Sequence, residues 1–207
     1  MHYNISKNFN NVYIISAPSG AGKTSLVKSL CNDWDFIQPS ISHTTRQRRS
    51  GEVEGKDYFF VTKNKFMKQI SKNYFLEYQN VYGNYYGTSI ESVNSIRNIG
   101  YDVILEINYE GMLEVKNIIS DAITIYILPP NIKTLENRLI NRGDDQNEII
   151  KRRIRSSKKE LNYAQFADYI ITNDIFDDAL YDLKRIILKE KMKNKYLDNW
   201  INSIISK

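Results

Sequence analysis

A glycine-containing loop between a short apolar run and an amphipathic segment constrains the fold of this chain most strongly. The loop reads APSGAGKTS over residues 17–25 and follows the β-branched run NVYIIS at residues 11–16. A strand that enters a helix through such a loop leaves several backbone N–H groups directed at one spot, where a phosphate fits. Lys23 adds a cation for the outer phosphates of a nucleotide, and Thr24 adds a hydroxyl ligand for Mg²⁺. We therefore expect this loop to bind the phosphates of a nucleotide, with Mg²⁺.

The loop departs from the common pattern G-x-x-x-x-G-K-[ST] at its first position, where Ala17 replaces glycine. This position needs a small residue at the point where strand becomes loop. We expect the additional methyl group to be tolerated unless the position requires a positive φ. The residues of the loop expected to contact the nucleotide are Ala17, Pro18, Ser19, Gly20, Ala21, Gly22, Lys23, Thr24 and Ser25.

Strand-like and helix-like segments alternate along most of the chain. Strands are expected at residues 11–16, 57–62, 102–108, 122–128 and 168–173, and helices at 23–33, 89–99, 109–119, 131–142, 145–166 and 176–195. The alternation predicts an α/β fold in which helices flank a parallel sheet. Residues 42–90 interrupt the pattern, because they are rich in Tyr, Gly and Asn and predict strands joined by glycine turns. They are expected to form a small β-rich insertion.

Composition excludes several classes of protein. The chain is 42% hydrophobic and 26% charged, which is ordinary for a globular protein. Its apolar runs, such as residues 122–128, are far shorter than the roughly 20 residues of a membrane helix. The single cysteine, Cys31, excludes an intramolecular disulfide, and the polar N-terminal segment does not resemble a signal peptide. A cytoplasmic location is expected.

Two clusters of basic residues lie at 46–49 and 151–159, within a chain of net charge +5. Neither cluster is flanked by a motif typical of nucleic-acid binding, and either cluster alone is more typical of a solvated face. The second cluster follows the turn at residues 141–147, between two expected helices. That arrangement suits a mobile helical hairpin.

Several further segments resemble the guanylate kinases, which transfer a phosphoryl group from ATP to GMP. The segments are YIISAPSGAGKTS, SHTTRQRRSGEVEGKDYFF, FLEYQNVYGNYYGTS, ILEINYEG, LENRLINRG and DYIITND, in the order and spacing of that family. The resemblance covers nearly the whole chain. It implies one P-loop domain with core parts at 1–41, 91–133 and 159–207, a GMP-binding insertion at 42–90 and a lid at 134–158. It further implies Mg-dependent, reversible formation of ADP and GDP by a monomer or homodimer, with no nucleic-acid or membrane partner.

The residues that the resemblance assigns to GMP also make chemical sense. Guanine presents N1–H and N2–H₂ as adjacent donors, so one carboxylate that accepts both selects guanine over adenine. The resemblance gives this role to Glu77, with hydroxyl contacts from Ser42 and Thr88. Guanidinium and phenol groups are donors suited to a phosphate dianion. The acceptor phosphate is assigned to Arg46, Arg49, Tyr58 and Tyr86, and the remaining acceptor-site residues are Glu52, Glu106 and Asn108.

The expected lid supplies further cations. Arg138 and Arg142 are four residues apart and share one helix face, and Arg153 lies on the next helix. A loose phosphoryl-transfer transition state benefits most from cations and exclusion of water, so Lys23 and these three arginines are the expected catalytic residues. Asn173 is similar to a family residue that contacts the adenine of ATP, although an asparagine there also suits a helix cap. The neighbouring cations Lys151, Arg152, Arg155, Lys158 and Lys159 are expected to be solvated.

The chain also departs from the family near residue 108. The family usually has an aspartate where this chain has Asn108, and a glutamine where it has Glu110. Asn108 brings no charge to Mg²⁺ or guanine, so weaker GMP binding is expected, unless the carboxylate two residues further on compensates for part of the loss.

Three alternative functions remain open at this point. The first is a non-catalytic guanylate-kinase-like module that binds phosphorylated proteins, although such modules tend to lose the cations that this chain retains. The second is a kinase of another nucleotide, against which Glu77 and Ser42 argue. The third is a basic RNA-binding protein, which would have no use for the phosphate-binding loop.

Overall fold

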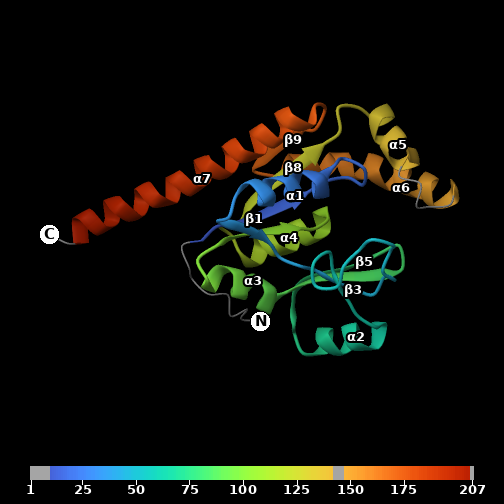
Figure 1. Cartoon of the computed structure of the whole chain (residues 1–207), viewed down its shortest axis with the longest axis horizontal. Helices are drawn as coiled ribbons and strands as arrows, with labels where there is room; N and C mark the ends of the chain where they lie inside the picture. Colours follow the sequence, from blue (N-terminus) through green and yellow to red (C-terminus); the bar gives the residue numbers. More distant parts are fainter. Residues whose placement is uncertain (1–9, 142–146, 206–207) are drawn as a thin grey trace. The chain divides into compact units, whose positions relative to one another are not determined.

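The computed structural model describes residues 10–141 and 147–205, with side chains for residues 10–141 and 153–193. The chain forms two compact units (Figure 1). The first unit contains Met1–Ser16 and Trp34–Thr124, and the second contains Ala17–Asp33 and Ile125–Lys207. Parallel strands flanked by helices occur in each unit. The expected α/β fold class is therefore confirmed.

The first unit contains a parallel sheet in which β7 (Asp102–Glu106) lies between β2 (Ile37–Pro39) and β1 (Val12–Ser16). Every residue of β1 is buried, which matches its continuous run of β-branched and aromatic side chains. Helix α3 (Ile90–Asn98) packs on β7, and α4 (Tyr109–Ile118) packs on β1. The short strand β2 was not expected, because three residues carry too little pattern to be recognised.

A second sheet of the first unit has the strand order β4-β3-β6-β5. Its strands are β3 (His43–Thr44), β4 (Phe59–Phe60), β5 (Phe75–Val81) and β6 (Asn84–Ser89), and β5 and β6 form an antiparallel hairpin. The turn of this hairpin places Tyr82 and Gly83 at φ of 50° and 84°. These strands lie within residues 42–90, where a β-rich insertion was expected.

Two features of the insertion differ from the sequence-based expectation. The strand expected at residues 57–62 is only two residues long, and it pairs with β3 instead of joining the parallel sheet. Helix α2 (Lys63–Ser71) was not expected. It begins where the Thr62 side chain accepts a hydrogen bond from the Lys65 N–H at 3.2 Å, and it buries only Phe66 against the sheet, on Phe75. One buried residue gives too little periodicity to predict a helix.

The second unit contains α1 (Lys23–Asp33), most of β8 (Ile123–Leu128), β9 (Tyr169–Thr172) and three further α-helices. Strands β8 and β9 pair in parallel. Helices α5 (Ile132–Asn141) and α6 (Asn147–Glu160) pack against each other, and the chain continues from α6 into a 3₁₀ helix, η1 (Leu161–Phe166). The last helix, α7 (Phe176–Ile205), is longer than expected and packs against α1. Within the described part of the chain, no helix is both long and apolar enough to cross a membrane.

Candidate nucleotide-binding site

The phosphate-binding loop of the second unit requires glycine at two positions. Gly20 and Gly22 have φ of +90° and +95°, which side chains rarely adopt. A Cβ atom on Gly22 would lie 2.2 Å from the Asn173 amide nitrogen, so this position also requires a close approach. Ala17 is not among the described residues with positive φ. The methyl group at the first position of the motif therefore imposes no backbone strain.

Side chains from other parts of the second unit hold this loop in place. The Asn173 amide donates a hydrogen bond to the Ala21 carbonyl at 2.7 Å, and the Ser157 hydroxyl donates to the Ser19 carbonyl at 3.3 Å. Arg138 in turn donates from Nη2 to the Asn173 carbonyl at 3.1 Å. Asn173 is only 4% exposed. The loop conformation is thus fixed by α6 and by the segment after β9.

The expected donor-site cations lie at the ends or on the faces of helices. Lys23 is the first residue of α1 and is half-buried, whereas Thr24 and Ser25 are exposed. Arg138 on α5 and Arg153 on α6 are also half-buried, and the Arg138 Nη1 atom is buried with no hydrogen-bond partner among the described residues. Arg142 lies outside the described residues.

The outer basic residues of α6 differ from Arg153 in exposure. Arg155 and Lys159 are exposed, and Lys158 forms an exposed ion pair with Glu136 at 3.0 Å. These three residues are solvated, as expected. The side chains of Lys151 and Arg152 lie outside the described part of the chain.

The carboxylate expected to bind guanine is buried in the β5–β6 hairpin of the first unit. Glu77 is 5% exposed, and its Oε1 accepts hydrogen bonds from the Thr88 N–H at 3.1 Å and the Thr88 hydroxyl at 2.7 Å. Ser42 directly precedes His43, which pairs with Gly87 across the antiparallel β3–β6 ladder. This register brings Ser42 next to Thr88. The structure therefore gathers the three residues expected at the base on adjacent strands.

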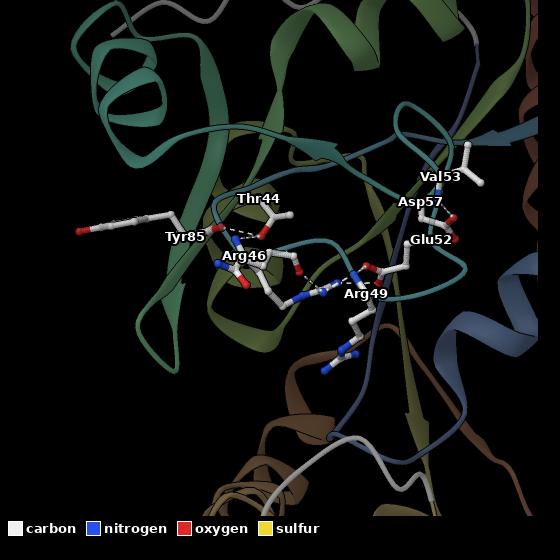
Figure 2. A network of polar contacts seen from close by, with 8 residues as sticks. Thr44, Arg46, Arg49, Glu52, Val53, Asp57 and Tyr85 are labelled. Carbon is white, nitrogen blue, oxygen red and sulfur yellow. Dashed lines mark hydrogen bonds and ion pairs between the residues drawn. The ribbon is translucent and has the colours of Figure 1, made fainter.

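The arginines expected at the acceptor phosphate share one carboxylate (Figure 2). Arg46 contacts Glu52 through both terminal nitrogens, with Nη2 to Oε1 at 2.6 Å and Nη1 to Oε2 at 3.1 Å. The Arg49 backbone N–H donates to the same Oε2 atom at 2.8 Å. The Arg46 and Glu52 side chains are only 14% and 18% exposed. Glu52, expected among the substrate-binding residues, thus contacts Arg46 and the Arg49 backbone.

Aromatic rings surround the Arg46 guanidinium. Its central carbon lies 5.5 Å from the centre of the Tyr58 ring and 5.9 Å from that of Phe60. The rings of Tyr58 and Tyr86 are in edge-to-face contact. Tyr86 is two residues before Thr88 in β6, so their side chains lie on the same face of the sheet. Tyr86 therefore lies on the same face as Thr88, a residue expected at the base, and Tyr58 contacts Tyr86 there.

These contacts shift the pKa values of the cluster. Burial lowers the pKa of Arg46, but hydrogen bonds to Glu52 and Tyr86 outweigh it and raise that pKa above its ordinary value. Burial raises the pKa of Glu52, but the hydrogen bond from Arg46 outweighs it and the pKa is lowered. Burial raises the pKa of Tyr58 to about 12. At neutral pH the ion pair is therefore fully charged, and the Tyr58 hydroxyl keeps its proton for donation.

The residues that depart from the family pattern lie at the start of α4. Asn108 caps this helix, because its Oδ1 accepts from the Gly111 N–H at 3.0 Å, while its amide nitrogen donates to the Glu110 carboxylate. Glu106, at the end of β7, is half-buried. The carboxylate missing at residue 108 is thus retained in the same turn, two residues further on.

Sequence reasoning missed two close contacts at these sites. Asn173 was considered for adenine binding or helix capping, and its hydrogen bond to the loop was not foreseen. Gly111 was not considered, although a Cβ atom on it would lie 2.7 Å from Glu77 Oε2. The signal available in the sequence was a glycine directly after the segment ILEINYE, inside a predicted helix.

Comparisons with known proteins agree on one family. The family model described as Guanylate kinase matches residues 9–190. Guanylate kinase of Methylobacillus flagellatus is 45% identical over 185 residues, covering 89% of this chain and 92% of that protein. Guanylate kinase of Escherichia coli K12 is 43% identical over 198 residues, covering 95% and 96%. The crystal structure of guanylate kinase from Anaplasma phagocytophilum matches with a TM-score of 0.75 and 25% identity, covering 91% of this chain and 90% of that one.

Proposed function

The chain belongs to the guanylate kinase family, and from this membership we propose that it transfers a phosphoryl group reversibly from ATP to GMP. The products are ADP and GDP. The observation that supports GMP as the phosphoryl acceptor is the buried Glu77 carboxylate. A charged carboxylate shielded from water is costly unless it accepts hydrogen bonds from nearby donors. Guanine offers two such donors side by side.

Base recognition is assigned to Glu77, with Thr88 and Ser42. Because both hydrogen bonds from Thr88 go to Oε1, they fix the orientation of the carboxylate before guanine arrives. The carboxylate then accepts from guanine N1–H and N2–H₂. Adenine presents an acceptor at N1, which would face the negative charge and be rejected. Selection thus depends on hydrogen-bond pattern rather than on size.

Binding of the acceptor phosphate is assigned to Arg46, Arg49, Tyr58 and Tyr86. Glu52 fixes Arg46 through two bonds and fixes the backbone at Arg49 through a third. Figure 2 shows the Arg49 guanidinium directed away from Glu52, where it remains available to an anion. Arg46 and the two phenols supply further donors to a dianion. Glu52 has the role of positioning these donors, and it repels phosphate itself.

Binding of ATP is assigned to the loop at residues 17–25, with Lys23 at the outer phosphates and Asn173 near the adenine. The exposed Thr24 hydroxyl fits the role of an Mg²⁺ ligand, since magnesium at such sites is held by few protein oxygens together with phosphate oxygens. When bound, Mg²⁺ neutralises charge that develops on the phosphates. Arg138, Arg142 and Arg153, within the lid proposed at residues 134–158, stabilise the same charge and exclude water.

The alternative of a non-catalytic phosphoprotein-binding module is not favoured. The relatives that match most of the chain are named as guanylate kinases, and the chain retains Lys23, Thr24 and Arg138. A cytoplasmic location and a monomeric or homodimeric state are proposed with the function, because both substrates are small cytoplasmic nucleotides that require no macromolecular partner.

A coupled assay of ADP formation tests the proposed function. The protein is supplied with ATP and Mg²⁺ and with GMP, AMP, CMP or UMP in turn. We expect turnover with GMP at least about a hundredfold above the others, since a site built for a hydrogen-bonding edge rejects analogues that lack it. Chelation of Mg²⁺ should abolish turnover with GMP. Absence of GMP-dependent ADP formation, or equal turnover with AMP, would contradict the proposal.

A further inference from the structure

The first turn of α4 approaches the Glu77 carboxylate more closely than a side chain would allow. Gly111 is the third residue of this helix, and helix α4 packs against β5, the strand that carries Glu77. A Cβ atom on Gly111 would lie 2.7 Å from Glu77 Oε2 and 3.2 Å from Glu77 Cδ. Real Cβ atoms do not come as close to other atoms as 2.7 Å. Any side chain at residue 111 therefore has to displace the carboxylate or the helix.

The helix backbone itself gives no reason for glycine at this position. Gly111 is not among the residues with positive φ, unlike Gly20 or Gly22. At an ordinary helical position alanine is the better helix former, because glycine loses more conformational freedom on folding. The contact with Glu77 is what makes glycine the fitting residue there.

Both partners of this contact are buried and held by hydrogen bonds. Glu77 is 5% exposed, and two hydrogen bonds from Thr88 hold its other oxygen, Oε1. On the helix side, the Gly111 N–H is held at 3.0 Å by the cap residue Asn108, and Gly111 is itself buried. A methyl group inserted between two fixed elements has to shift one of them by several tenths of an ångström.

We propose that Gly111 is a positioning residue for recognition of the GMP base. Its lack of a side chain lets the first turn of α4 support Glu77 Oε2, while Thr88 holds Oε1. The carboxylate is thereby fixed from both sides at the place where it meets the guanine donors. This inference rests on the proposed role of Glu77 in GMP binding, and it adds a specificity-determining residue on a helix that does not otherwise carry the base contact.

Steady-state kinetics of Gly111→Ala in the full chain test the inference. We expect the KM for GMP to rise about ten- to a hundredfold, because the misplaced carboxylate loses hydrogen bonds to the base. The KM for ATP should remain within about twofold. The urea midpoint of unfolding should fall only modestly, because the helix propensity of alanine offsets part of the cost of overpacking. Asn117→Ala is the matched control, since it places alanine at an exposed position of the same helix and should leave all parameters unchanged.

A second variant separates positioning from general damage. Glu77→Asp withdraws the carboxylate by one methylene group and so makes space for a Cβ atom at residue 111. The double variant Gly111→Ala with Glu77→Asp should bind GMP no worse than Glu77→Asp alone, so the two effects are not additive. If Gly111→Ala fails to fold, folding and GMP turnover of the double variant replace it as the readout.

The outcomes distinguish this inference from the proposed function. Wild-type kinetics for Gly111→Ala, or additive losses in the double variant, would overturn the positioning role while leaving the guanylate kinase activity intact. Parallel increases in the KM for GMP and the KM for ATP would also overturn it, because they indicate general distortion. A wild-type protein that does not turn over GMP would instead refute the proposed function.

Discussion

Replacement of Glu52 by glutamine tests how the arginines at the acceptor phosphate are held. Glu52 accepts from both terminal nitrogens of Arg46 and from the Arg49 backbone N–H. Glutamine keeps the size of the side chain but offers one oxygen instead of two and carries no charge. Arg46 therefore loses one of its two charge-assisted hydrogen bonds. The NH₂ group of the introduced glutamine then faces an N–H group of Arg46, and two donors cannot bond to each other.

The expected magnitude follows from the exposure of the pair. The Arg46 and Glu52 side chains are 14% and 18% exposed, so this ion pair is intermediate between a solvated and a buried one. A solvated ion pair contributes about 0–1 kcal/mol, and disruption of a buried one costs about 3–5 kcal/mol. We expect Glu52→Gln to lower the free energy of unfolding by about 1–3 kcal/mol. A similar loss of preorganisation at the phosphate would raise the KM for GMP about tenfold.

The stability difference should depend on pH in a definite direction. The folded-state pKa of Glu52 is lower than its ordinary value of 4.5. The contribution of ionised Glu52 to the free energy of unfolding is therefore fully present above pH 4.5, and it is lost as the pH falls through the folded-state pKa. Urea unfolding of both proteins should therefore show the full difference at pH 7. Below about pH 4.5 the difference should shrink.

A matched control lies in the same loop. The Glu54 carboxylate accepts from the Phe60 N–H at 3.0 Å, and in the part of the chain that the structure describes it forms no hydrogen bond or ion pair with Arg46. Glu54→Gln removes the same charge and should change the KM for GMP by less than about twofold. Tighter GMP binding by Glu52→Gln would refute the reasoning, because it would mean that Glu52 competes with the phosphate for Arg46 instead of positioning it.

Two further variants address the donor loop and the start of α4. Lys23→Ala should abolish transfer while circular dichroism and the unfolding midpoint stay near wild type, because the ammonium is expected to meet phosphate; retained turnover would refute its role. Asn108→Asp should place a second carboxylate beside Glu110 and so, contrary to the expectation from the family pattern, raise the KM for GMP about tenfold. Asn108→Asp with Glu110→Gln should restore it. Better GMP binding by Asn108→Asp alone would show that a negative charge at residue 108 affects GMP binding more than repulsion from the Glu110 carboxylate does.

Local sequence signals predicted the elements that carry many consecutive patterned residues. The strands β1, β7, β8 and β9 and the helix α1 were all expected from their apolar periodicity. Helix α2 and strand β2 were not, because each buries too few side chains to produce a pattern, and their formation depends on packing against distant segments. Strand β4 was predicted too long because most of residues 57–62 have strand-like side chains, but only Phe59 and Phe60 form a strand, which pairs with β3.

Site residues were predictable where chemistry restricts the residue type. The phosphate-binding loop around Lys23 was predicted from residue types alone. Glu77 and Thr88 were singled out by the family resemblance, and the hydrogen bonds between them, which depend on the register of the β5–β6 hairpin, were not predicted. The contacts of Asn173 with Ala21 and of Gly111 with Glu77 were not predictable, because each joins residues distant in the sequence and depends on the depth of packing. The Asn108–Glu110 bond was anticipated only in part, because the sequence analysis noted the carboxylate two residues after Asn108 but did not predict the hydrogen bond between the two side chains.

The most direct test of the account is the effect of Glu77→Gln on the two substrates. Glutamine preserves the size of the side chain but accepts through one oxygen without charge, so guanine loses one of its two hydrogen bonds to the carboxylate. Steady-state ADP formation should show a KM for GMP at least about tenfold higher and a KM for ATP within about twofold of wild type. Equal changes for GMP and ATP, or an unchanged KM for GMP, would contradict the claim that this carboxylate selects the base.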